Sequence, residues 1–262
     1  MPKNDPPPTT RRPLPGTAAP DEVARFSALA DEWWDADGKF RPLHQINPAR
    51  IAFIRDRVAG HFGRDPLGRD ALGGPGPLDG LDMLDIGCGG GLLGEPMRRL
   101  GARVTGIDAG EETVRVAALH AKQGGLDIEY RCVLPEALAA DGRTFDVVLN
   151  MEVIEHVADV GAFLAACCAM VKPGGIMVMS TLNRTLKSFA LAKVGAEYVL
   201  RWLPAGTHDW RKFVKPSELA AGLRPQGFDI VELKGLAYRP LSDEWLLADD
   251  VDVNYMAVAV KR

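Results

Sequence analysis

The feature that most constrains this chain is a regular alternation of strand-like and helix-like segments between residues 81 and 183. Five short apolar runs are typical of strands: LDMLDIG (81–87), RVTGIDAG (103–110), IEYRCV (128–133), FDVVLNM (145–151) and GGIMVMSTLN (174–183). Helical patterns such as LLGEPMRRLG and EETVRVAALHAKQGG lie between them. Strands that alternate with helices predict an α/β chain with a mostly parallel, doubly wound sheet.

Two further apolar segments, FDIVELKGLAY (228–238) and NYMAVAVKR (254–262), predict strands that close one edge and bring the sheet to seven strands. Residues 1–20 contain seven prolines and few large apolar side chains, so we expect a disordered tail there. The glycine- and proline-rich segment 63–80 predicts a surface loop. Apolar residues at helical spacing between these two segments predict an N-terminal helical extension, and residues 21–262 then form a single domain.

Composition excludes several classes of function. The net charge of −4 argues against a general nucleic-acid-binding protein, which needs basic residues to neutralise phosphates. The four cysteines form no C-x-x-C pair, so we expect no zinc site. The longest uninterrupted apolar run, residues 163–171, is far shorter than the roughly 18 residues of a membrane-spanning helix.

Glycine is concentrated in the segment LDIGCGGG, residues 84–91, directly after the first predicted strand. A strand that runs through glycines into a helix exposes backbone N–H groups, and ligands bind at this end of a parallel sheet. The dinucleotide fingerprint is out of register here, whereas D-x-G-x-G-x-G fits from Asp85 through Gly87 and Gly89 to Gly91. A carboxylate at the strand end repels a pyrophosphate and attracts an amine. S-adenosyl-L-methionine carries such an amine and no phosphate.

The second predicted strand ends in Asp108, about 20 residues further along the chain. An acidic side chain at this position of an α/β sheet can accept hydrogen bonds from both ribose hydroxyls of a nucleoside. The alternative is that Asp108 caps the helix that follows it. The glycine-rich segment and the acidic residue occur together, which favours the ribose contact.

Four motifs in this order, LDIGCGGG, VTGID, FDVVLNMEVIEHV and VKPGG, resemble those of class I S-adenosylmethionine-dependent methyltransferases. The segments EWWDADGKFRPLHQINPARI, STLNRTLKSF, VGAEYVLRWLPAGTHDWRKFVKPSEL and DVNYM resemble, more narrowly, the bacterial ubiquinone-biosynthesis O-methyltransferases. The likeness covers about residues 22–262, except the glycine-rich loop. It implies a Rossmann-like fold and cofactor contacts from Arg50, Gly87, Asp108 and Met151.

The resemblance also implies the reaction and its partners. It predicts methyl transfer from S-adenosyl-L-methionine to phenolic hydroxyls of polyprenylated catechols and of demethylubiquinol. It further implies a cytoplasmic location at the periphery of the inner membrane, with other ubiquinone-biosynthesis enzymes as partners and no nucleic acid. Two alternatives stay open: a small-molecule methyltransferase of another pathway, and a membrane-associated assembly module without turnover.

The segment MEVIEHV after the fourth predicted strand carries Glu152, Glu155 and His156. At positions i, i+3 and i+4 they would share one face of a helix. Two carboxylates and an imidazole suit Mg²⁺ or Mn²⁺, which can activate a catechol as a Lewis acid. In the alternative without metal, His156 removes the phenolic proton as a base. Glu152 and His156 are the catalytic candidates, but a nitrogen bound to metal cannot also take the proton.

The segment after the fifth predicted strand, residues 181–216, concentrates basic charge. Seven basic and two acidic side chains give it a local charge of +5, against −4 for the whole chain. Leucine, tyrosine and tryptophan lie between the basic residues, which are Arg184, Lys187, Lys193, Arg201, Arg211, Lys212 and Lys215. This combination predicts an insert that lies on an anionic membrane surface. The alternative is a lid over the substrate pocket with solvated charges, and the two roles are compatible.

Overall fold

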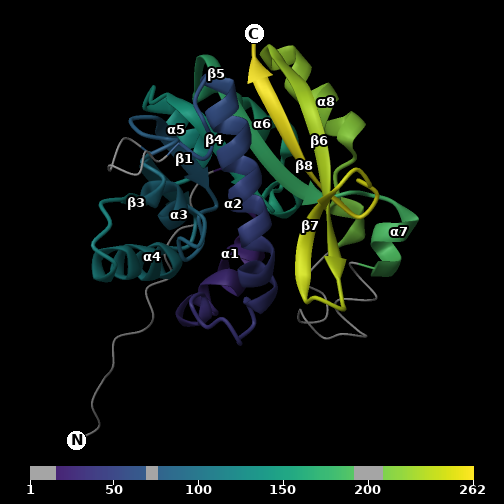
Figure 1. The fold of residues 1–262 in the computed structure, drawn as a ribbon, viewed down its shortest axis with the longest axis horizontal. Helices are drawn as coiled ribbons and strands as arrows, with labels where there is room; N and C mark the ends of the chain where they lie inside the picture. The colour runs from purple at the N-terminus through teal and green to yellow at the C-terminus, as the bar shows by residue number, and fades with distance from the viewer. Residues whose placement is uncertain (1–15, 69–75, 192–208) are drawn as a thin grey trace, which may run out of the picture.

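The computed structural model describes residues 16–68, 76–191 and 209–262. Within them, eight strands form one sheet in the order β3-β2-β1-β4-β5-β8-β6-β7 (Figure 1). Strands β1 to β5 pair in parallel, and β8, β6 and β7 add to them antiparallel. The strands are β1 (Asp82–Ile86), β2 (Arg103–Asp108), β3 (Glu129–Cys132), β4 (Phe145–Met151), β5 (Val171–Leu182), β6 (Phe228–Arg239), β7 (Glu244–Ala248) and β8 (Asn254–Lys261).

Helices cover both faces of the sheet, as the alternating sequence pattern predicts. The α-helices are α1 (Pro20–Ser27), α2 (Arg41–His61), α3 (Gly94–Arg99), α4 (Glu111–Gln123), α5 (Pro135–Ala140), α6 (Val160–Ala169), α7 (Leu186–Ser188) and α8 (Pro216–Leu223). On one face, α2 and α3 bury Phe53, Ile54 and Met97 in one core. On the other, α5, α6 and α8 form a second core that includes Phe163 and Leu219.

The strands predicted from the sequence are confirmed, and the sheet has one strand more than expected. Strands β8 and β6 extend the sheet beyond β5, as their apolar sequences predict. The additional strand, β7, forms a hairpin with β6 and is the edge strand of the sheet. It has five residues and begins with a glutamate after the turn-forming sequence RPLSD, so its own strand signal is weak.

The amino-terminal segment joins the body of the protein before the predicted end of the tail. Ala18 forms an isolated β-bridge with Val157, and the C=O of the buried Thr17 accepts a backbone hydrogen bond at 2.7 Å. The prediction of a disordered tail over 1–20 is therefore wrong for residues 16–20, because these backbone contacts order them. Residues 1–15 lie outside the described residues.

The predicted surface loop at 63–80 is described at its two ends. Leu67 is exposed, as expected for a surface loop, whereas Leu78 is fully buried in the core beside α2. Residues 69–75 lie outside the described part of the chain. The chain therefore enters the core before β1, a few residues earlier than the glycine and proline content predicts.

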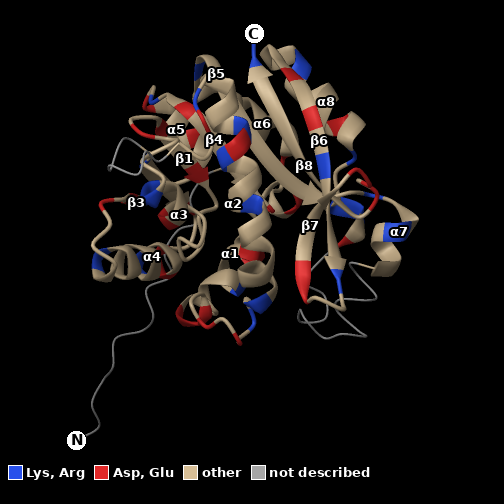
Figure 2. Ribbon diagram, viewed as in Figure 1, with Lys and Arg blue, Asp and Glu red and all other residues tan. Residues whose placement is uncertain are grey.

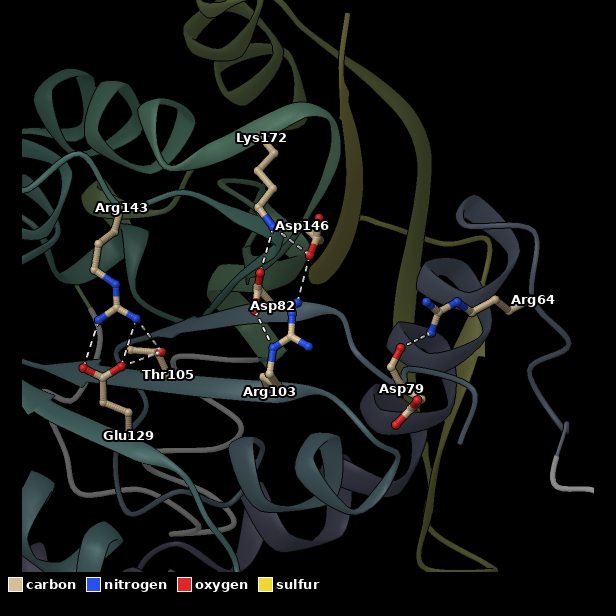
Figure 3. Close-up of polar contacts among 9 residues, drawn as sticks. All are labelled: Arg64, Asp79, Asp82, Arg103, Thr105, Glu129, Arg143, Asp146 and Lys172. Atoms are coloured by element: carbon tan, nitrogen blue, oxygen red, sulfur yellow. Dashed lines mark hydrogen bonds and ion pairs between the residues drawn. The ribbon is translucent and has the colours of Figure 1, made fainter. Parts of the chain in front are cut away.

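Charged side chains link the amino ends of the parallel strands, at the edge opposite to their carboxyl ends. Figure 3 shows Lys172 of β5 between Asp82 of β1 at 2.8 Å and Asp146 of β4 at 3.0 Å. Arg103 of β2 donates to Asp82 at 2.8 Å. A neighbouring cluster joins Thr105 of β2, Glu129 of β3 and Arg143 of the segment before β4. These ion pairs and hydrogen bonds tie five strands together and leave the carboxyl ends free for a ligand site.

Candidate active site

A cavity of about 1080 Å³ lies at the carboxyl ends of β1, β2, β4 and β5. In open α/β sheets ligands bind at this edge. The predicted site residues that line the cavity are Arg50, Asp85, Gly87, Gly89, Asp108, Met151, Glu152 and His156. The remaining one, Glu155, is buried and is not part of the lining. The structure thus brings residues from α2, β1, β2 and the end of β4 into one site.

The glycine-rich segment after β1 turns with positive φ angles of 67° at Gly87, 54° at Gly89 and 90° at Gly91. Residues with a side chain rarely adopt this conformation. Space is the second constraint, because a Cβ at Gly89 would overlap Trp33 and one at Gly91 would overlap the Tyr130 hydroxyl. The glycines are therefore required by the backbone conformation and by the protein's own aromatic side chains.

Two carboxylates flank this segment. Asp108 accepts hydrogen bonds from Gly89 N–H at 3.1 Å and from Gly110 N–H at 2.8 Å. Asp85 is 3% exposed, and its Oδ2 has no hydrogen-bond partner among the described residues. Burial, with a smaller contribution from the Asp108 charge, raises the pKa of Asp85 to about 7. A cationic group in the cavity would stabilise the charged form of Asp85.

The buried Arg50 of α2 provides the opposite charge. One terminal nitrogen of its guanidinium donates to Glu152 Oε1 at 2.7 Å, and Ser180 Oγ donates to the same oxygen at 2.7 Å. The Nε of Arg50 has no hydrogen-bond partner among the described residues. A buried guanidinium N–H and a buried Asp85 oxygen, both without a hydrogen-bond partner among the described residues, belong to side chains that line one cavity and fit a ligand with both a carboxylate and an ammonium group. The amino-acid end of S-adenosyl-L-methionine has both.

The prediction that Glu152, Glu155 and His156 share one helical face is wrong. Glu152 precedes the 3₁₀ helix η2 (Ile154–His156), and its left-handed φ of 58° breaks the helical spacing. Glu155 is buried, and its Oε2 accepts from Thr181 Oγ1 at 2.9 Å. Burial, followed by the charge of Glu152, raises the pKa of Glu155 well above its ordinary value.

The irregular backbone at Glu152 also affects the predicted metal site. Within residues 16–68, 76–191 and 209–262, no three His, Cys, Asp or Glu side chains are placed to hold one ion. Glu152 is engaged by a guanidinium, which competes with a cation for its oxygen. The residues predicted to bind Mg²⁺ therefore do not fit a shared metal ion in this arrangement.

His156 lines the cavity and contacts helix α1. Its Nδ1 lies 3.4 Å from Glu22 Oε2, and its ring stands edge-on to Phe26 at a centroid distance of 5.4 Å. The contact with His156 is the largest influence on Glu22 and holds the pKa of this carboxyl below its ordinary value. A carboxylate beside Nδ1 favours the tautomer that carries its proton there, which gives Nε2 the lone pair of a base.

Two tryptophans of the N-terminal extension cover the glycine-rich segment. Trp33 is 8% exposed, packs against Gly89 and Gly90, and stacks on Phe40 at a centroid distance of 3.9 Å. Trp34 donates its indole N–H to the Gly90 C=O at 2.9 Å. The extension is therefore part of the site, because it supplies an aromatic wall of the cavity and a hydrogen bond to the loop.

Helices α3 and α4 hold Trp34 in place. Its ring is stacked on the His120 ring at a centroid distance of 3.4 Å with an interplanar angle of 7°. His120 Nδ1 lies 2.6 Å from Glu95 Oε1, which belongs to a carboxylate only 2% exposed. Glu95 thus contacts His120, His120 stacks on Trp34, and Trp34 donates a hydrogen bond to the backbone of the glycine-rich segment.

Trp34→Phe is expected to weaken cofactor binding about two- to tenfold. The phenyl ring keeps the stacking on His120 but lacks the N–H that bonds to Gly90, and a hydrogen bond of this kind contributes about 0.5–1.5 kcal/mol. Titration calorimetry with S-adenosyl-L-methionine measures the change. The matched control is Trp210→Phe, which loses an indole bond to the Thr185 C=O at 2.8 Å outside the cavity lining. Equal affinities of the two variants would contradict the role of Trp34.

Four residues at or beside the site are not among those predicted from the sequence: Trp33, Trp34, Glu22 and Tyr130. A signal for the tryptophans is present, because two adjacent indoles in a charged segment need a partner to cover them. Tyr130 lies on β3 and fills the space that Gly91 and Gly106 leave open. For Glu22 the sequence holds no signal, since an acid in the first turn of a helix is common.

The insert predicted at 181–216 is described only at its two ends, and residues 192–208, with Lys193 and Arg201, lie outside the described residues. Three apolar side chains in and after α7 are exposed: Leu186 by 83%, Phe189 by 42% and Leu191 by 55%. None of the described helices is long and apolar enough to cross a membrane.

Two of the described basic side chains of this insert, Arg184 and Lys187, pair with acids elsewhere in the chain. Figure 2 shows basic colour on α7, where Lys187 pairs with Asp250 and lies 3.6 Å from Asp252. Arg184 pairs with Glu218 of α8. The charge of this part of the insert is therefore partly balanced by acids of the same chain.

A cavity that suits a nucleoside with an amino-acid end and no phosphate, at the carboxyl edge of a parallel sheet, defines the class I S-adenosylmethionine-dependent methyltransferases. A family model described as a methyltransferase domain matches residues 47–233. The solved structure of magnesium protoporphyrin IX methyltransferase from Synechocystis PCC 6803 with bound S-adenosylmethionine has the same fold. The two structures align with a TM-score of 0.56 and 17% sequence identity, and the alignment covers 94% of this chain and 100% of that chain.

Similar named relatives identify one family within this class. The ubiquinone biosynthesis O-methyltransferase of Parvibaculum lavamentivorans is 57% identical over 92% of both chains. The protein of the same name from Paramagnetospirillum magneticum is 56% identical over 94% of this chain and 96% of its own. The chain belongs to the family of ubiquinone biosynthesis O-methyltransferases, and its methyl donor is S-adenosyl-L-methionine.

Proposed function

We propose that this chain transfers a methyl group from S-adenosyl-L-methionine to a phenolic hydroxyl of a polyprenylated catechol and of demethylubiquinol. The observation that carries the proposal is that Asp85 and Arg50, which line the same cavity as His156, each have a buried polar atom without a hydrogen-bond partner among the described residues. These groups are suited to hold the two ends of a zwitterion beside a base. The family of the chain supports the choice of a phenol as the acceptor.

In this proposal, each cofactor contact uses a group that the cavity presents. S-adenosyl-L-methionine, when bound, supplies a methyl group on a positively charged sulfur. Asp85 binds the ammonium group, Arg50 binds the carboxylate in a fork-like arrangement, and Asp108 accepts from the ribose hydroxyls. The other proposed contacts are the backbone of Gly87 and Gly89 and the side chain of Met151.

His156 is the proposed catalytic base. It takes the proton of the phenolic hydroxyl on Nε2, while Glu22 orients the ring from Nδ1 and stabilises the imidazolium that forms. Glu152 has a different part, because one of its oxygens already accepts from Arg50 and Ser180. It orients the guanidinium toward the cofactor and is therefore a positioning residue of the cofactor site.

A labelling experiment tests the reaction. The purified protein is incubated with S-adenosyl-L-methionine carrying a ¹³C-methyl group and with a catechol that bears a short prenyl tail, and the product is analysed by NMR. The expected product carries the label on oxygen. Label on carbon or nitrogen of another acceptor would favour a methyltransferase of a different pathway. Cofactor binding without transfer to any acceptor would favour an assembly module without turnover.

We also propose that the insert at 181–216 places the enzyme on an anionic membrane surface, such as the cytoplasmic side of the inner membrane. The exposed Leu186, Phe189 and Leu191 beside the basic Lys187 support this proposal, since apolar and basic side chains together favour such a surface. A prenylated acceptor resides in the bilayer, so a membrane contact near the cavity would shorten its route. Contacts with other ubiquinone-biosynthesis enzymes stay a prediction.

The protein is expected to co-sediment with phosphatidylglycerol vesicles at low salt, to be released at high salt, and to ignore phosphatidylcholine vesicles. Each basic residue near an anionic surface contributes about 1 kcal/mol, which salt screens. Changing Lys187, Lys193 and Arg201 to glutamate should abolish co-sedimentation. The control reverses the same amount of charge on α3 and α4, at the exposed residues Arg99, Arg115 and Lys122. Equal loss in both triple variants would argue against a specific role of the insert.

A further inference from the structure

The cavity extends beyond the cofactor residues into an apolar slot between α2 and the β6–β7 hairpin. Leu43 and Ile46 of α2 form one wall, and Leu236 of β6 and Trp245 of β7 form the other. All four line the cavity and belong to one hydrophobic cluster with Met151 at the end of β4. The slot therefore meets the rest of the cavity at Met151, and His156 lines the same cavity.

Polar contacts fix the separation of the two walls at both ends of α2. Near its start, Gln45 donates to the carboxylate of Asp243 in the β6–β7 turn at 3.1 Å, and Arg41 lies 3.7 Å from the same group. Toward its end, Arg57 makes a two-pronged contact with Glu232 of β6, with one of the two bonds at 2.8 Å. A slot that is pinned at both ends keeps its width without a ligand.

The strand order places the β6–β7 wall of this slot away from Asp85 and Asp108. These two proposed cofactor residues belong to β1 and β2, whereas the hairpin lies beyond β4 and β5; Arg50 on α2 and Met151 at the end of β4 are the proposed cofactor residues nearest to the slot in the chain and the sheet. Its outer end contains Leu191 after α7 and the ion pair between Lys187 and Asp250. The slot thus leads from the reaction centre toward the exposed apolar side chains of α7.

We propose that this slot binds the isoprenoid tail of the acceptor. A catechol with its hydroxyl beside His156 must send its tail away from the cofactor, and the slot is the continuous apolar path on that side. Branched isoprene units suit walls of leucine, isoleucine and tryptophan, because burial of apolar surface drives their binding. The proposal rests on the proposed function, since it takes a prenylated phenol as the acceptor.

Leu43→Asp tests the slot with two acceptors, a catechol that bears a farnesyl tail and the same catechol without a tail. A charge in the slot is expected to raise KM for the farnesylated acceptor by roughly tenfold or more and to leave KM for the tail-less one unchanged. Leu43→Trp, which keeps the apolar character and fills the slot, should have the same selective effect. The control is Leu119→Asp on α4, at a leucine that is 51% exposed and does not line the cavity.

Equal effects on both acceptors, or no effect on either, would overturn the proposal. If the parent protein methylates neither acceptor, the proposed function fails and a second measurement decides on the slot. Farnesol is then titrated alone, and quenching of tryptophan fluorescence that disappears in Trp245→Phe reports binding at the slot wall. Quenching that persists in Trp245→Phe and in Leu43→Asp would place the tail elsewhere.

Discussion

Asp85→Asn is expected to make the protein more stable and, at the same time, a weaker binder of its cofactor. Without ligand, the Asp85 carboxylate is buried and its Oδ2 has no partner among the described residues, which raises its pKa from the ordinary 3.8 to about 7. The unfolded chain binds its proton less tightly, so the folded protein loses stability as the pH rises from about 4 to 7. At pH 8, asparagine should raise the free energy of unfolding by up to about 4 kcal/mol.

The same substitution should have the opposite effect on cofactor binding, which it is expected to weaken. In the proposed complex the ammonium group of S-adenosyl-L-methionine stabilises the charged Asp85 carboxylate, and asparagine cannot replace this charge-assisted hydrogen bond. We expect the affinity to fall about tenfold to a hundredfold, which corresponds to about 1.5–3 kcal/mol. In the parent protein, the affinity should also fall as the pH drops below about 7, because Asp85 then becomes neutral. Calorimetry at pH 6 and pH 8 measures both effects.

Asp82→Asn on the same strand is the matched control. The Asp82 carboxylate is 34% exposed, and its contacts with Arg103 and Lys172 lower its pKa. Its contribution to stability is present at neutral pH and is lost as the pH falls, so this substitution should lower the stability at pH 8. It should leave the cofactor affinity unchanged, because Asp82 lies at the opposite edge of the sheet. An Asp85→Asn variant that is less stable than the parent at pH 8 would contradict the assignment of an open buried carboxylate.

The gathering of Asp85, Gly87, Gly89 and Asp108 at one cavity could be predicted because their signals are local in the sequence. The turn at Gly87 and Gly89 needs glycine for its φ angles, and Asp85 and Asp108 each stand at the carboxyl end of an apolar strand. Parallel pairing of β1 with β2 then brings all four together without any further information. The parallel pairing and the helices on both faces follow from the same alternation, whereas the order of the strands does not.

The rest of the site depends on contacts between segments far apart in the sequence. Glu22 reaches His156 only because the N-terminal extension folds across the cavity, and no local pattern encodes that path. The left-handed φ of Glu152 carries no signature either, since glutamate rarely adopts it, so the assumption of a regular helix misplaced the three residues of MEVIEHV. The position of the β6–β7 hairpin also depends on a distant segment, because Asp243 and Glu232 accept hydrogen bonds from side chains of α2.

His156→Gln is expected to lower kcat by roughly 10²- to 10⁴-fold, the usual contribution of a general base. Glutamine has a similar size and can still bond to neighbouring groups, but it cannot take the phenolic proton. Because His156 is not among the residues proposed to bind the cofactor, the affinity for S-adenosyl-L-methionine should not change. The parent should show a limb of the pH–rate profile in which activity rises with pH, and the variant should lack it. A profile of the same shape in both proteins would argue against a base at this position.

Glu22 also pairs with Arg25 at 2.6 Å, but its effect on kcat should come through His156, and a double-mutant cycle tests this dependence. Glu22→Ala removes the carboxylate that lies 3.4 Å from Nδ1, so we expect a loss of roughly tenfold in kcat, whereas Glu22→Gln keeps a neutral oxygen at this position and should lose less. In the His156→Gln background both substitutions should have little effect, since the ring that Glu22 orients is gone. Asp21→Asn, at an exposed acid one residue earlier on α1, is the control and should leave kcat unchanged. Activity that is lost on treatment with EDTA and restored by Mg²⁺, in the parent but not in His156→Gln, would place His156 on a metal ion and overturn its assignment as the base.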